Sequence, residues 1–273
     1  MDMIERVERA LAQASGHTFD PRVYAETGFF ILRQAIGKDV VARWQQAWHD
    51  FHAAQLSQGR NVNRANPVAL TEELPDVLGK MYREPVFIDT VKQIFGEHVA
   101  LFNHRFVIKD EHSSGKVFLH QDSCYHLGNL NKCSLFVPLS IANEGNGGMT
   151  FHAGSHKLGY LGDAGEINPE AFDIRWPKVT PELHPGDFIV MNSALWHESG
   201  PNKNGVHRIL ADMIMQPADD PTGKELLAGE WKTDFFYSPL NCARYFTNSR
   251  VLKIIRYETE LGLRPAPAPA NTD

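Results

Sequence analysis

Apolar side chains in the first hundred residues recur mainly at helical spacing. The stretches that show it are 1–16, 37–54, 71–82 and 85–95. Aromatic and β-branched residues are concentrated instead in residues 27–35, and this composition predicts one strand between the first two helices. We therefore expect a mainly helical flank over residues 1–98.

From residue 99 onward the pattern changes to short extended runs. These runs cover 100–109, 116–122, 133–142, 148–153, 187–192 and 208–216. Turn signals rich in Gly, Ser, Asn and Pro separate them. Many short strands joined by such turns are typical of a β sandwich or barrel. The predicted fold class is therefore mainly β, with a jelly-roll core over residues 99–217 and helices on its N-terminal side.

The remaining residues indicate one domain and no second core. No internal repeat and no linker composition interrupts the chain. We expect a single domain over residues 1–264 that closes with a helical segment over 218–264. The tail PAPAPANTD at 265–273 has the composition of a disordered segment.

Composition narrows the class of protein. The 273 residues are 42% hydrophobic and 22% charged with a formal net charge of −6, and no basic stripe marks a nucleic-acid-binding surface. No run approaches the roughly 18 apolar residues of a membrane span. The N-terminus lacks the pattern of a secretory signal, and three cysteines without a CxxC pair suit a reducing compartment. We expect a soluble, cytoplasmic protein that binds neither nucleic acid nor membrane. The sequence does not decide whether the protein forms a homo-oligomer.

A candidate metal site begins with His120 and Asp122. Because the two residues are two positions apart, they project from the same face if the segment is a strand. One imidazole and one carboxylate on one face are two adjacent ligands, and a further His would complete the arrangement of non-haem Fe(II) oxygenases. In a chain with 13 histidines such a pair also arises by chance, so it carries little weight alone.

The second half of the candidate site follows a Pro-Gly-Asp turn. His197 is followed by Ser199 two positions later and by Arg208 eleven positions later. If His197 ends one strand and Arg208 begins the next, both can face the same pocket. A chelating 2-oxoglutarate needs a planar, permanently charged donor for its far carboxylate, which is Arg rather than Lys, and a hydroxyl such as Ser199 can add one hydrogen bond.

Two other classes of function remain open on the residue patterns. The first is a cupin-type metal enzyme that does not use 2-oxoglutarate, such as an isomerase or another dioxygenase. The second is a non-catalytic jelly-roll binding protein in which the His and Asp residues are incidental. Arg208 and Ser199 separate the first from a 2-oxoglutarate enzyme, because only the latter needs a clamp for a distant carboxylate.

The motifs together resemble those of the phytanoyl-CoA dioxygenase family of Fe(II)/2-oxoglutarate-dependent oxygenases, which includes ectoine hydroxylase. The matching segments are HQD at 120–122, WHESGPNKNGVHR at 196–208, NEGNGGMTFHAGSHKLG at 143–159 and GFFILRQAI at 28–36. The resemblance implies a double-stranded β-helix core with iron inside its mouth. It also implies Fe(II), 2-oxoglutarate and O₂ as the reacting set, with succinate and CO₂ released as a substrate is hydroxylated.

The same resemblance suggests further site residues. Asn103 falls where ectoine hydroxylase has a Gln that contacts 2-oxoglutarate, and Lys109 falls on a matching Lys. Halogenating relatives have Ala or Gly at the position of Asp122, so a carboxylate there favours hydroxylation.

Substrate-binding residues are expected just after the metal motif. The candidates are Tyr125, His126, Ser134 and Phe136. The chain lacks an evident basic cluster for the phosphates of an acyl-CoA, and polar donors at Lys109, His104, His126 and Asn129 surround the motif. The predicted partner is therefore a small polar metabolite.

Overall fold

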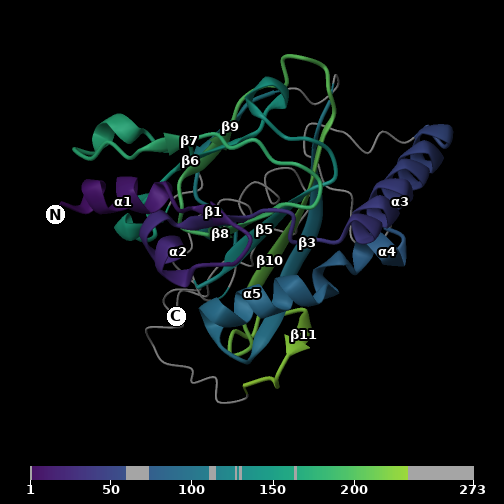
Figure 1. Cartoon of the computed structure of the whole chain (residues 1–273), viewed down its shortest axis with the longest axis horizontal. Helices are drawn as coiled ribbons and strands as arrows, with labels where there is room; N and C mark the ends of the chain where they lie inside the picture. The colour runs from purple at the N-terminus through teal and green to yellow at the C-terminus, as the bar shows by residue number, and fades with distance from the viewer. Residues whose placement is uncertain are drawn as a thin grey trace, which may run out of the picture.

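The computed structural model describes residues 2–59, 74–110, 115–126, 128, 131–162 and 165–232. Helices and short strands make up the N-terminal part (Figure 1). They are α1 (Met3–Leu11), β1 (Ser15–Gly16), α2 (Pro21–Thr27), β2 (Phe29–Leu32), α3 (Lys38–Ser57), α4 (Asp76–Gly79), η2 (Met81–Arg83) and α5 (Pro85–Phe95). Among the described residues, no helix combines the length and the apolar character needed to cross a membrane.

Strands and short 3-10 turns make up the remainder. The strands are β3 (Val99–Lys109), β4 (Val117–His120), β5 (Cys133–Pro138), β6 (Met149–His152), β7 (Lys178–Val179), β8 (Phe188–Asn192), β9 (His197–Ser199), β10 (Arg208–Pro217) and β11 (Glu225–Ala228). The 3-10 turns are η3 (Asp122–Tyr125), η4 (Glu144–Asn146), η5 (Ser155–Leu158) and η6 (Pro169–Ala171).

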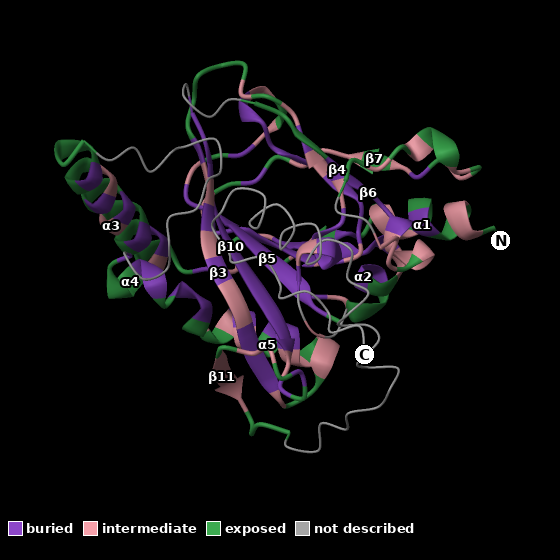
Figure 2. Ribbon diagram, turned by 180° about the vertical axis from the view of Figure 1, so that it is seen from behind, coloured by how far each residue is buried: buried purple, intermediate pink, exposed green. Residues whose placement is uncertain are grey.

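The strands form two sheets that face each other. The larger sheet has the order β1-β2-β8-β5-β10-β3-β11, and the smaller has the order β4-β9-β6-β7. Phe29 of the larger sheet stacks on Phe151 of the smaller, with ring centroids 4.8 Å apart, and so closes the space between them. Buried residues are concentrated along the central strands β5 and β10, whereas β3 alternates between buried and intermediate positions over much of its length (Figure 2).

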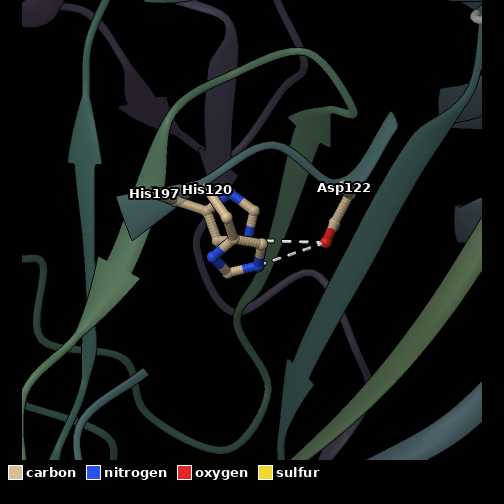
Figure 3. Close-up of side chains that lie close together, drawn as sticks. All are labelled: His120, Asp122 and His197. Carbon is tan, nitrogen blue, oxygen red and sulfur yellow. Dashed lines mark ion pairs between the residues drawn. The ribbon is translucent and has the colours of Figure 1, made fainter. Parts of the chain in front are cut away.

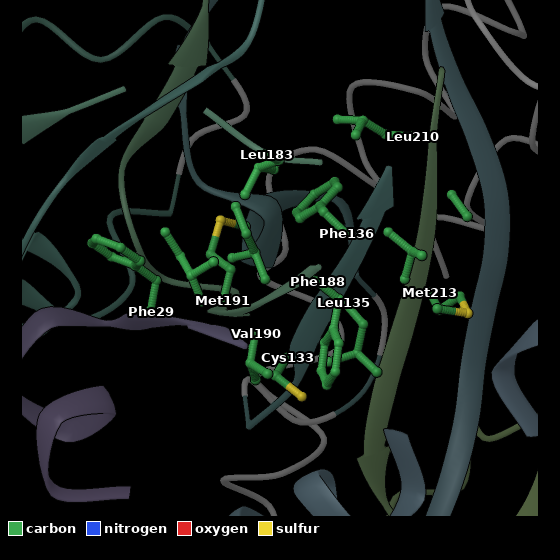
Figure 4. Close-up of a cluster of buried hydrophobic side chains, with 14 of the residues drawn as sticks. Phe29, Cys133, Leu135, Phe136, Leu183, Phe188, Val190, Met191, Leu210 and Met213 are labelled. Atoms are coloured by element: carbon green, nitrogen blue, oxygen red, sulfur yellow. The ribbon is translucent and has the colours of Figure 1, made fainter. Parts of the chain in front are cut away.

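Helices cover the outer face of the larger sheet. Trp48 of α3 packs on Phe106 of β3 with ring centroids 4.7 Å apart, and Phe87 of α5 meets Phe188 of β8 edge to face at 4.9 Å. Because strand side chains alternate between faces, the neighbouring residues point toward the smaller sheet. The buried cluster drawn in Figure 4 lies around these strands.

Local signals explain where several elements begin and end. Asp2 and Glu5 form a capping box at the start of α1. Asp20 caps α2, which starts with a proline and ends at Gly28 with φ at +83°. A Cβ on Gly28 would lie 2.6 Å from the His156 ring and 2.6 Å from the Leu195 side chain, so glycine is needed there both for conformation and for space.

Three features differ from the sequence-based expectations. The capped helix α2 and the two-residue strands β1 and β7 were not predicted, because such short elements carry no periodic pattern. His197 begins β9 instead of ending the preceding strand. Residues 225–228 form strand β11, which pairs with the start of β3, where a helical segment was expected; the open edge of β3 provides the hydrogen bonds. Residues 233–264 of that segment and the predicted tail lie outside the described residues.

A buried lysine links the strands β5 and β10. Nζ of Lys132 donates to Asp220, Gln216 and Thr222, and it lies 4.7 Å from the centre of the Phe102 ring. The side chains of Lys132 and Asp220 are both fully buried. Removing one charge of a buried pair leaves the other without compensation, whereas removing both is far less costly.

Replacing Lys132 with Met should therefore lower the free energy of unfolding by about 3–5 kcal/mol. The double variant Lys132→Met/Asp220→Leu should recover a large part of this loss. The matched control is Lys80→Met, which breaks the exposed pair with Asp76 and should change stability by less than about 0.5 kcal/mol. Urea unfolding measures all three, and equal destabilisation in the single and double variants would contradict the expectation.

Candidate metal centre

Three side chains from two separate parts of the sequence meet between the two sheets. His120 ends β4 and is the register partner of His197, the first residue of β9. Nε2 of each imidazole lies 3.6 Å from Oδ1 of Asp122 (Figure 3). The ligand atoms of the three residues lie within 4.8 Å of one another, so one ion can contact all of them.

Asp122 reaches this position from a turn. The strand β4 stops at His120, and Asp122 is the first residue of η3. The intervening Gln121 keeps an extended backbone with φ −112° and ψ 138°, so the side chains on either side of it still point the same way. The predicted common face is thus present, although the strand that was expected to provide it ends two residues earlier.

Hydrogen bonds fix the orientation of all three side chains. Nδ1 of His120 lies 2.7 Å from the Phe118 carbonyl, and Nδ1 of His197 lies 3.0 Å from the Leu195 carbonyl. A carbonyl can only accept, so each Nδ1 carries the proton and each Nε2 is free to bind a metal. The Ser134 hydroxyl donates to Oδ2 of Asp122 at 3.1 Å, which leaves Oδ1 directed at the two imidazoles.

The protonation states also suit a metal. Burial lowers the pKa of His197 to about 4, so its imidazole is neutral at neutral pH. Burial alone would raise the pKa of Asp122, but the imidazoles of His197 and His120 outweigh it and hold the pKa well below its usual range. Two imidazole nitrogens and one carboxylate on one side of an ion leave the other positions open, as in non-haem Fe(II) oxygenases.

Two buried cations lie beside each other on the inner face of the larger sheet. Lys109, the last residue of β3, is the register partner of Arg208, the first residue of β10. Their relative exposures are 3% and 1%. Nζ of Lys109 donates to the carbonyls of Ser199 and Gly200, and Nη1 of Arg208 donates to the Gly147 carbonyl at 3.2 Å.

These cations lack a counter-ion within the described residues. Nε and Nη2 of Arg208 are buried and have no hydrogen-bond partner there, and no described carboxylate lies within ion-pair distance of Lys109 or Arg208. Burial lowers the pKa of Lys109 to about 7, with Arg208 adding to the effect, and burial lowers the pKa of Arg208 to about 10. A buried cation of this kind requires an anion, and a ligand carboxylate fits.

The other predicted residues divide between the site and its surroundings. Tyr125 meets the His120 ring edge to face at 5.6 Å, and His126 is buried against Phe102 at 5.2 Å. The side-chain oxygen of Asn103 accepts a hydrogen bond from Nζ of Lys224 at 3.0 Å, so this oxygen already has a partner within the protein. Ser134, predicted to bind substrate, donates from its hydroxyl to the carboxylate of Asp122.

Phe136 and His104 lie on strands of the larger sheet. Phe136 lies on β5 as the register partner of Asp212 on β10. His104, expected among the polar donors of the site, points to the outer face, where it packs on Tyr82 and Phe106 beneath the helices. Asn129 lies outside the described residues.

Sequence reasoning missed the pair Arg105 and Asp212. Arg105 donates from Nε to Oδ2 of Asp212 at 2.6 Å, across the same two strands that hold the buried cations. Each residue sits an even number of positions from Lys109 or Arg208, so the alternation of strand side chains was the available signal. The pairing register that brings the two strands together is not visible in the sequence.

Comparisons with known proteins agree with this fold. The family model described as Phytanoyl-CoA dioxygenase (PhyH) matches residues 24–210. No curated protein matches the chain at a significant level.

Several solved structures resemble the chain over most of its length. The alpha-ketoglutarate-dependent epimerase SnoN from nogalamycin biosynthesis has a TM-score of 0.60 at 20% identity, over 80% of this chain and 86% of that chain. EctD from S. alaskensis, with 2-oxoglutarate and 5-hydroxyectoine, has 0.60 at 19% over 76% and 81%. The non-heme monooxygenase ThoJ has 0.62 at 18% over 94% and 100%. The expected double-stranded β-helix fold is confirmed.

The role of Ser134 can be tested through metal affinity. Ser134→Ala removes the hydrogen bond that orients Asp122, and loss of such a bond should raise the Fe(II) dissociation constant about 10–100-fold. Anaerobic calorimetry measures this constant. Ser57→Ala, which removes an exposed hydroxyl at the end of α3, is the matched control and should leave it unchanged. Equal affinities in the Ser134 variant and the wild type would contradict this role.

Proposed function

The chain belongs to the phytanoyl-CoA dioxygenase (PhyH) family of Fe(II)- and 2-oxoglutarate-dependent oxygenases, and from this premise we propose that it hydroxylates an unactivated C–H bond of a small polar metabolite. Succinate and CO₂ are the co-products. The observation that carries the proposal is the pairing of a three-ligand metal set with two buried cations that lack a counter-ion among the described residues.

The proposed ligand assignment follows from the charges. His120, Asp122 and His197 hold Fe(II), since they offer two imidazole nitrogen atoms and one carboxylate oxygen. When bound, Fe(II) chelated by 2-oxoglutarate supplies the oxygen-activating chemistry that cleaves a C–H bond. This role would also explain why the buried Arg208 has unused donors: the far carboxylate of 2-oxoglutarate accepts from them.

The protein's own residues orient the reactants and exclude water. Lys109 and Arg208 fix one end of 2-oxoglutarate, and the Ser199 hydroxyl, two residues after His197, adds a donor on β9. Ser134 keeps Oδ1 of Asp122 directed at the metal position. The edges of Tyr125 and Phe118 flank the His120 ring, each at 5.6 Å, and restrict its rotation. A fixed ligand set directs the oxidation to one C–H bond.

Hydroxylation is proposed over halogenation because Asp122 fills the third protein position at the metal. Solved structures of this fold include an epimerase and a carbocyclase, so the outcome has to be read from the product. The deciding experiment measures succinate formed from 2-oxoglutarate across a panel of small metabolites, with mass spectrometry of each product. A gain of one oxygen atom supports hydroxylation; a loss of two hydrogens or an unchanged mass contradicts it.

Arg208 is the sharpest test of the cosubstrate. Arg208→Ala removes the planar donor and should raise the KM for 2-oxoglutarate by about 30–4,000-fold, since truncation of a buried charge partner typically costs about 2–5 kcal/mol. Arg208→Lys keeps the charge but loses the fork and should fall between. The matched control is Arg175→Ala, an exposed arginine paired with Glu170. An unchanged KM in the Arg208 variants would remove the 2-oxoglutarate assignment.

The affinity for 2-oxoglutarate should depend on pH through the amine of Lys109. The free protein holds the pKa of Lys109 at about 7 because of burial, and a bound carboxylate favours the charged amine, so binding of 2-oxoglutarate takes up a proton. Its dissociation constant should therefore increase as pH rises above about 7, by at most about tenfold per pH unit. Anaerobic titrations between about pH 6 and 9 measure the slope. Lys109→Met should bind more weakly and show a flatter profile; an equally steep profile in that variant would assign the proton elsewhere.

A further inference from the structure

Charged residues form two rungs on the ladder between β3 and β10. The first rung is Lys109 opposite Arg208, and the second is Arg105 opposite Asp212. The rung between them, Val107 opposite Leu210, is apolar. Because each strand advances four residues from one charged rung to the other, their Cα atoms are separated by roughly 13 Å. All of these side chains point to the inner face of the larger sheet, toward the smaller sheet that carries His120 and His197.

The second rung is incompletely satisfied by the protein. Within the described residues Arg105 uses only Nε, which donates to Oδ2 of Asp212 at 2.6 Å, and its side chain is 32% exposed. Oδ1 of Asp212 is buried and has no hydrogen-bond partner among the described residues. Burial raises the pKa of Asp212 to about 6, with Arg105 acting against the rise and Asp122 adding to it. A buried acceptor left in this state costs free energy until a donor reaches it.

The second rung lies next to the metal ligands. On the other side of β10, Asp212 is paired with Phe136 of β5, and the adjacent inward position of β5 is Ser134. Ser134 donates to the carboxylate of Asp122. The charge of Asp122 also contributes to raising the pKa of Arg105, after the larger effect of Asp212. The charges of the second rung therefore lie within electrostatic range of the metal ligand Asp122, four residues along the ladder from the first rung.

The two unused groups have complementary chemistry. The terminal nitrogens of Arg105 form a planar fork that suits a carboxylate. Oδ1 of Asp212 is a buried anionic acceptor, which suits a compact cationic donor such as an ammonium group. Both groups belong to one ion pair, so a ligand that meets them carries both charges close together.

We propose that Arg105 and Asp212 are the specificity-determining residues for a small zwitterionic substrate, such as a free amino acid. The carboxylate of the substrate accepts from the terminal nitrogens of Arg105, and its ammonium group donates to Oδ1 of Asp212. This inference rests on the proposed function, since it assigns the substrate of the same metal site. It narrows the small polar metabolite to a molecule with one carboxylate and one basic nitrogen.

The experiment uses the full chain loaded anaerobically with Fe(II) and 2-oxoglutarate. Calorimetry measures binding of the free protein amino acids and of β- and γ-amino acids, together with the N-acetyl derivative and the carboxamide of each one that binds. At least one free amino acid should bind. Its N-acetyl derivative and its carboxamide should each bind at least about tenfold more weakly, because each lacks one of the two charges.

Substitutions then assign each charge to a residue. Asp212→Asn should reduce the preference for the free amine over the N-acetyl derivative to less than about threefold, and Arg105→Lys should do the same for carboxylate over carboxamide. Both variants keep a polar group of similar size. If Arg105→Lys fails to fold, the double variant Arg105→Met/Asp212→Leu removes the whole ion pair and should lose both preferences.

Three results would overturn the inference. The first is that no zwitterion of the panel binds. The second is that Asp212→Asn weakens Fe(II) or 2-oxoglutarate binding but leaves the preference for the free amine unchanged, as expected if Asp212 serves only the metal centre. The third is that the derivatives bind as tightly as the free amino acid. The visible absorption band of the Fe(II)–2-oxoglutarate chelate separates these results from failure of the proposed function, because that band forms without substrate.

Discussion

The antiparallel pairing of β4 with β9 places His120 directly opposite His197, and the metal site depends on this contact. A shift of one residue in the register would turn one imidazole to the opposite face of the sheet. The pair is supported on both sides: the Phe118 and Leu195 carbonyls fix the two rings, and β9 is held in turn by β6. The smaller sheet thus supplies the two imidazoles, the turn after β4 supplies Asp122, and the larger sheet supplies the two buried cations.

Much of this arrangement could be predicted from the sequence. The extended runs predicted the strands β3, β5, β8 and β10. The spacing of His197, Ser199 and Arg208 indicated residues that the structure places on facing strands of the two sheets. Periodicity works for these segments because one face of each strand is buried and the pattern is long. The strand β9 has three residues and β7 has two, which is too short for a pattern.

What escaped the sequence depends on pairing between distant strands. Arg105 and Asp212 are separated by more than a hundred positions, and only the register of β3 with β10 brings them together. Gly147 is a similar case. Its carbonyl accepts from Arg208, its φ is +80°, and a Cβ there would lie 2.7 Å from Cδ of Lys109 and 2.7 Å from the Gly200 carbonyl. The sequence showed a glycine-rich turn, but not that this turn closes over the buried cations.

The apolar rung between the two charged rungs has an evolutionary consequence. Val107 and Leu210 separate the residues proposed to hold the cosubstrate from those proposed to select the substrate. Effects of substitutions at separated sites without shared partners are nearly additive. The residues at positions 105 and 212 can therefore be substituted together during evolution while those at positions 109 and 208 stay unchanged. Two substitutions on one rung could then change which substrate binds, while the residues proposed to hold the metal and the cosubstrate remain the same.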